Sequence, residues 1–167
     1  MTQPRAGFLL TRHWRDTPQG SELSFWLATD DGPLQVTLPP QESVAFIPEA
    51  QQAQAERLLQ GEKGFRFAPL ALRDFHRQPV VGLYCRAHRQ LMRLEKMLRD
   101  SGVTVYEGDI RPPERYLMER FITAPVWVEG ETRGSQLVNA RMKPNPDYRP
   151  PLKWVSLDIE TSRHGEL

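Results

Sequence analysis

The order of strand-like and helix-like runs between residues 43 and 107 constrains the fold of this chain most. Short runs rich in β-branched and aromatic residues predict strands, and runs with apolar residues at helical spacing followed by glycine predict helices. In chain order, the runs are SVAFI, EAQQAQAERLLQ, FRFAPLAL, VVGLYC, RAHRQLMRLEKMLRD and VTVYE. Strand, helix, strand, strand, helix, strand is the order of a split βαβ unit, the ferredoxin-like or RNA-recognition-like arrangement. The fold class predicted is therefore α+β.

The segments on either side of this unit predict further strands. Before it, GFLLTRHWR, SELSFWLAT and PLQVTLP alternate in polarity and are separated by the turn formers TPQG and DDG, which predicts an antiparallel β-meander over residues 7–39. After it, residues 110–142 predict a short helix with prolines in its first turn and then a pair of strands. The proline-rich run KPNPDYRPP predicts a linker. We therefore expect one domain over residues 1–145 and the start of a second over 146–167.

Length, charge and cysteine content exclude several classes of protein. A chain of 167 residues can bury one substantial core. Its formal net charge of +1 does not indicate a polyanion-binding protein as a whole, so any basic patch must be local. A single cysteine, Cys85, gives no disulfide framework, and no run approaches the roughly 20 apolar residues that span a membrane. We expect a soluble cytoplasmic protein with no membrane partner.

A basic stripe and an aromatic residue are candidates for nucleic-acid binding. The helix predicted from residue 86 carries Arg86, Arg89, Arg93 and Lys96 largely off its apolar face, where they can hold phosphates or simply form a solvated surface. The run KGFRF is similar to the start of the RNA-recognition signature, but it lies on the second strand of the unit instead of the third. Its two phenylalanines are therefore interpreted as core residues. On the third strand, Tyr84 is a candidate for stacking on bases.

Two carboxylates near the end of the chain are candidates for a metal site. Along LKWVSLDIE, side chains of a strand would alternate between faces, so Asp158 and Glu160 would point to the same side. Two adjacent carboxylates repel each other unless a cation compensates, and their hard oxygen atoms suit Mg²⁺ or Mn²⁺. A strand end that enters solvent is the alternative interpretation. Elsewhere, the four histidines lack zinc-ligand spacing, and there is no GxGxxG, P-loop or GxSxG motif.

The residues around Asp158 and Glu160 favour the metal site over a strand end that enters solvent. DYRPPLKWVSLDIET, preceded by VYEGDIRPPERYLMERFI, resembles family-B DNA polymerases where their N-terminal domain leads into the 3′→5′ proofreading exonuclease. The resemblance covers essentially the whole chain. It implies that residues 1–145 form the polymerase N-terminal domain and that residues 146–167 contain the first strand of a ribonuclease-H-like exonuclease domain. Asp158, Ile159 and Glu160 match the first exonuclease motif, in which the two acids help to bind the catalytic Mg²⁺ or Mn²⁺.

The same resemblance implies a role for the complete protein and partners for this chain. The parent enzyme would be a DNA-directed DNA polymerase, and this region would act as a scaffold that guides the template strand. Its partners would be DNA, as single-stranded template or primer 3′ end, and the remainder of the polymerase chain. Because the other exonuclease acids and the palm aspartates are not in these 167 residues, we expect no catalysis by this chain alone. The alternatives are a stand-alone single-stranded nucleic-acid-binding module and a purely structural segment.

Overall fold

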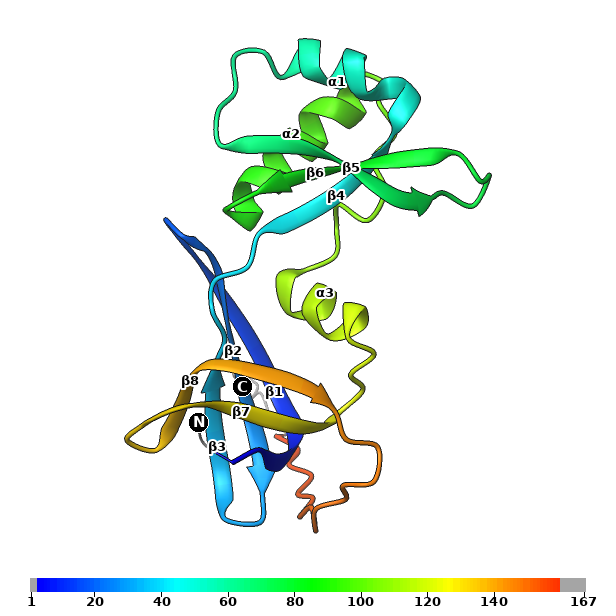
Figure 1. Cartoon of the computed structure of the whole chain (residues 1–167). Coiled ribbons are helices and arrows are strands. Elements are labelled where there is room, and N and C mark those ends of the chain that lie inside the picture. The colour runs from blue at the N-terminus through cyan, green and yellow to red at the C-terminus, as the bar shows by residue number, and fades with distance from the viewer. Residues whose placement is uncertain (1–2, 160–167) are drawn as a thin grey trace, which may run out of the picture.

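The computed structural model describes residues 3–159, which form two units with separate hydrophobic cores. Strands predominate and helices are few, as expected for an α+β fold (Figure 1). The first unit is a barrel of five strands. They are β1 (Arg5–Thr17), β2 (Gly20–Thr29), β3 (Gly32–Thr37), β7 (Pro125–Arg133) and β8 (Gln136–Pro144).

The barrel is closed by strands from both ends of the described chain. Its order is β1-β2-β3-β8-β7, with β7 pairing antiparallel to β1 and β8 pairing parallel to β3. The meander predicted over residues 7–39 is present as β1, β2 and β3. Five strands in this order, with a helix before the fourth, give the Greek-key barrel of an OB fold.

Alternation along β2 explains how the barrel is filled. Leu23, Phe25 and Leu27 are almost completely buried and point inward, whereas Trp26 between them is 44% exposed on the outer face. The helix α3 (Pro112–Glu119) packs against β1 and β2 and contributes Tyr116 to the same core. The Tyr116 hydroxyl accepts a hydrogen bond from the backbone N–H of Met142 at 3.2 Å. The helix therefore belongs to the barrel core and not to the second unit.

The second unit is inserted between β3 and α3. It contains β4 (Ser43–Pro48), the 3₁₀ helix η1 (Glu49–Gln51), α1 (Gln52–Leu58), β5 (Phe65–Arg73), β6 (Pro79–Cys85) and α2 (His88–Asp100). The sheet order is β4-β6-β5, and both pairings are antiparallel. The apolar side of α2, including Leu91, Leu94 and Leu98, packs in one core with residues of β4 and β6.

The predicted strand over residues 103–107 is not present as a strand. It is reduced to one antiparallel bridge between Phe46 and Tyr106, whose backbone N–H groups donate to each other's carbonyls at 3.0 and 2.8 Å. The Val105 carbonyl instead accepts from the Arg99 guanidinium at 2.7 Å, and Glu107 adopts a left-handed backbone with φ of 55°. Because the Val105 carbonyl is already hydrogen-bonded and the backbone leaves the extended region at Glu107, the pairing with β4 is limited to Tyr106, and the fourth strand of the predicted split βαβ unit is incomplete.

The predicted strand at the end of the chain is also absent. Residues 151–159 have no regular secondary structure, and Val155, Leu157 and Ile159 are 80 to 88% exposed. A strand requires a neighbour that satisfies its backbone N–H and C=O groups, and no strand of residues 3–159 pairs with this segment. The first strand of a ribonuclease-H-like domain is therefore not formed here. Glu160 lies outside the described residues.

The hairpin of β1 and β2 connects the two units. Asp16, near its tip, accepts hydrogen bonds from the backbone N–H groups of His88 at 2.9 Å and Arg89 at 3.0 Å. The Trp14 ring meets the His88 ring edge to face at 5.9 Å. Asp16 therefore caps the first turn of α2 from the barrel, in a position where the N-cap residue Ala87 provides no side-chain acceptor.

Candidate functional site

The candidate metal site is not assembled within the described residues. Asp158 is exposed on an irregular segment, and Glu160 lies outside residues 3–159. Within that range, no three His, Cys, Asp or Glu side chains gather closely enough to hold a metal ion. The structure therefore shows the position of only one of the two predicted ligands, and it does not bring other ligands to it.

The segment that carries Asp158 leaves the barrel from a fixed point. The Asn145 backbone N–H donates to the Pro125 carbonyl at 3.0 Å, and the Tyr148 hydroxyl donates to Asp30, in the turn between β2 and β3, at 3.0 Å. In Figure 1, the segment then departs from the side of the barrel opposite α1 and α2. The predicted linker is thus attached to the barrel at its start, through Asn145 and Tyr148.

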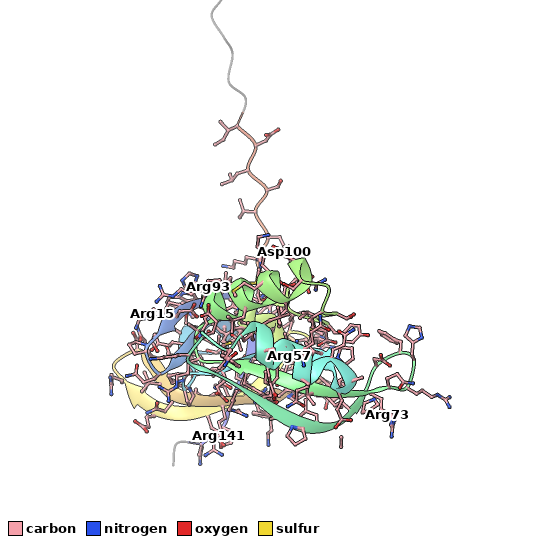
Figure 2. The ribbon with its side chains drawn as sticks, turned by 90° about the horizontal axis from the view of Figure 1, so that it is seen from above. Arg15, Arg57, Arg73, Arg93, Asp100 and Arg141 are labelled. Carbon is pink, nitrogen blue, oxygen red and sulfur yellow. The ribbon has the colours of Figure 1, made fainter. Side chains whose placement is uncertain are left out.

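The basic stripe on α2 is partly neutralised by acidic neighbours. Arg93 pairs with both carboxylate oxygens of Glu62, at 2.7 and 2.5 Å, and Lys96 pairs with Asp100 at 2.8 Å. Figure 2 shows Arg93 and Asp100 on the outer side of α2. Within the described part of the chain, the side chains of Arg86 and Arg89 make no hydrogen bond or ion pair. The structure therefore leaves two of the four predicted cations without such a partner. Arg89 lies in the first turn of α2, whereas Arg86 precedes the helix, which begins at His88 and not at the predicted residue 86.

Tyr84 lies on the sheet face that the helices leave uncovered. It is half-buried, and the Arg66 guanidinium lies over its ring at 4.1 Å from the centroid. A Cβ atom on Gly82 would lie only 2.5 Å from the Tyr84 ring, so the glycine makes room for the aromatic side chain. Phe65 and Phe67 pack against the helical core, which confirms their interpretation as core residues.

Three features that bear on the candidate sites were not predicted from the sequence. Trp26 is exposed on the outer face of the barrel, Asp16 caps α2 from a distant strand, and Arg115 and Arg120 of the α3 region lie beside the uncovered sheet face. The polarity alternation along β2 could have identified Trp26 as an outward residue. The other contacts join segments that are far apart in sequence, and no local pattern indicates them.

Two family models match adjoining parts of the chain. The model described as DNA polymerase II, N-terminal, matches residues 7–42, and the model described as DNA polymerase II, insertion domain, matches residues 43–103. The first range contains β1, β2 and β3, and the second begins where β4 begins. The boundary between the models therefore coincides with the start of the unit inserted into the barrel.

Individual proteins agree with these models. DNA polymerase II of Escherichia coli (strain K12) is 77% identical over 163 residues, which are 98% of this chain and 21% of that protein. The solved structure of the family B DNA polymerase from Pyrobaculum calidifontis matches with a TM-score of 0.66 at 18% identity, over 88% of this chain and 21% of that chain. This chain thus spans about one fifth of the length of both relatives.

Sequence and fold together define the class of this protein. The chain belongs to the family-B DNA polymerases and corresponds to their N-terminal region. Within that family, it is similar to DNA polymerase II, across the N-terminal and insertion domains. No helix in residues 3–159 is long and apolar enough to cross a membrane.

Proposed function

We propose that this chain is the N-terminal segment of a DNA-directed DNA polymerase that proofreads with a 3′→5′ exonuclease. In this proposal, the barrel and the inserted unit form a scaffold beside the template strand, and Asp158 and Glu160 belong to the first exonuclease motif. The observation that supports it is the exposure of the alternating segment around Asp158, since Val155, Leu157 and Ile159 have no apolar cover here. An apolar segment of this kind is suited to become a buried strand when other strands of an exonuclease domain are present.

The spacing of the acids defines the chemistry proposed for the complete enzyme. In an extended strand, residues two apart share one face, so the carboxylates of Asp158 and Glu160 would converge on the same divalent cations. When bound, Mg²⁺ or Mn²⁺ would supply an activated water and charge stabilisation for phosphodiester cleavage. The role of this chain's own residues, Asp158 and Glu160, would be to hold the ions.

A proofreading assay of the full-length polymerase tests this proposal. With Asp158→Ala and Glu160→Ala combined, we expect loss of Mg²⁺-dependent removal of a mismatched primer 3′ end and little change in primer extension. Ser156→Ala is the matched control, because residue 156 would share the same strand face but carries no charge. Proofreading that persists in the double variant would exclude the two acids as metal ligands.

A second candidate function is the binding of single-stranded nucleic acid by the chain itself. The observation that favours it is an OB-type barrel with Trp26 exposed on β2, since such barrels often combine stacking aromatics with cations along a strand. The free cations Arg86 and Arg89 would be the phosphate contacts. The fold by itself does not establish this function.

Fluorescence anisotropy with a labelled oligonucleotide tests this candidate. Each phosphate contact to single-stranded DNA contributes about 0.7 to the slope of log affinity against log salt, so Arg86→Ala with Arg89→Ala should reduce the slope by about 1.4. Arg93→Ala is the control, because Arg93 is already paired with Glu62 and its loss should change the slope less. If the unaltered chain shows no measurable binding, this candidate fails and the role as a scaffold remains.

A further inference from the structure

Alternate residues of β1 connect the barrel to α3 and to the inserted unit. Residues two apart on a strand share one face, so Arg12, Trp14 and Asp16 form a row. Arg12 pairs with Glu114 of α3 at 2.8 Å. Trp14 contacts the His88 ring, and Asp16 accepts hydrogen bonds from the first turn of α2. This row is therefore a junction that holds the first turn of α2 on the β1–β2 hairpin.

His88 is buried in this junction although its ring can take up a proton. It is the first residue of α2 and is only 8% exposed. Within residues 3–159, its Nδ1 atom and the Oε2 atom of Glu114 are both buried without a hydrogen-bond partner, so these two atoms do not bond to each other. A protonated imidazole donates from both ring nitrogens, and a buried donor without an acceptor is costly. The observed arrangement therefore fits the neutral ring.

The charges around His88 do not reverse this preference. Burial lowers the pKa of its imidazole below the ordinary value of 6.5, although the charges of Asp16 on the hairpin and Glu114 on α3 raise it. The cation of the same row, Arg12, is paired with Glu114. Cys85, which ends β6, carries no charge near neutral pH, because burial raises the pKa of its thiol to about 12. The docked His88 ring is thus neutral at neutral pH.

We propose that His88 is a proton-operated latch between the two units. Neutral His88 keeps the first turn of α2 docked on the β1–β2 hairpin, and protonation of its ring releases that turn. Because the released ring binds the proton better than the docked ring does, the equilibrium shifts toward release as pH falls below the ordinary value of 6.5. Asp16 cannot cause this response, since its pKa is lowered from 3.8 and it stays ionised in mild acid.

Amide hydrogen exchange of the chain, followed by NMR between about pH 5 and 7.5, tests this inference. The N–H groups of His88 and Arg89 report on the latch, because both donate to Asp16. After correction for the intrinsic pH dependence of exchange, their protection should fall by up to about tenfold per pH unit below the ordinary histidine pKa. The N–H of Phe25, in the barrel core, should keep its protection. Protection of His88 and Arg89 that stays constant or rises in mild acid would overturn the inference.

Three variants assign the response to His88. His88→Phe keeps a ring beside Trp14 but cannot be protonated, so protection should no longer depend on pH. His13→Asn is the matched control, because His13 is exposed and its ring lies 6.5 Å from that of Trp14, and this variant should keep the full response.

Glu114→Gln gives a readout that does not need replacement of His88. It removes a charge that favours the protonated ring, so release should require a lower pH. A response that persists in His88→Phe, disappears in His13→Asn, or fails to move to lower pH in Glu114→Gln would contradict the assignment of the latch.

Discussion

Asp16 is the single residue that most directly holds the inserted unit against the barrel. Burial raises the pKa of its carboxyl group, but hydrogen bonds from the N–H groups of Arg89 and His88 and from the Ser21 hydroxyl lower that pKa overall below its usual value. The ionised form is thus the one that the folded chain prefers. A carboxylate at the first turn of a helix is also favoured by the helix dipole.

Replacement of Asp16 should destabilise the chain. For Asp16→Ala, we expect a loss of about 1 to 2 kcal/mol in the free energy of unfolding, because the first turn of α2 loses its only side-chain cap. Asp31→Ala is a suitable control, since Asp31 is exposed in the turn between β2 and β3. Urea denaturation measures both, and similar effects of the two variants would rule out a special role for Asp16.

The same residue predicts a pH dependence. Because its pKa is lower in the folded chain, Asp16 contributes stability above the ordinary value of 3.8, and this contribution is lost as pH falls through the lower folded value. The stability difference between the unaltered chain and Asp16→Asn should therefore be constant near neutral pH and shrink in acid. Denaturation at a series of pH values checks this, and a difference that grows in acid would have the wrong sign.

At the scale of elements, the sequence predicted correctly those strands and helices whose own residues define which side is buried. The alternation in β1 to β3 and the spacing of Leu91, Leu94 and Leu98 in α2 each define a buried side before any partner is known. Residues 103–107 and 152–160 have similar local patterns. For residues 103–107, the neighbouring strand β4 is present but pairs only through Phe46 and Tyr106, whereas residues 151–159 find no partner strand within residues 3–159. The parallel pairing of β3 with β8 could not be predicted from local patterns either, because the whole inserted unit lies between the two strands in the sequence.

The tight turn between β1 and β2 depends on Gly20. Its φ is 145°, and a Cβ atom there would lie 2.7 Å from the Gln41 carbonyl oxygen. We expect Gly20→Ala to destabilise the chain by about 1 to 3 kcal/mol through backbone strain. Gly61→Ala is the control, since nothing lies within 4 Å of that site. Thermal unfolding compares them, and an unchanged midpoint for Gly20→Ala would show that the turn adapts.

At the scale of the whole molecule, residues 3–159 form a barrel that is interrupted by one inserted unit of strands and helices. The chemical type of the candidate site stays a prediction, which rests on the spacing of Asp158 and Glu160 and on the resemblance. Its assembly could not be predicted, because the apolar segment around Asp158 finds no partner strand within residues 3–159. The cavities between β4, the hairpin of β5 and β6, and α3 could not be predicted either, because their walls come from segments that are far apart in the sequence.

The most direct test of the central proposal is anomalous diffraction from crystals of the complete polymerase soaked in Mn²⁺. The proposal predicts that residues 152–160 form a strand within a sheet and that a manganese peak lies in contact with the carboxylates of Asp158 and Glu160. It would be contradicted if both carboxylates were fully defined in the electron density and faced away from every manganese peak.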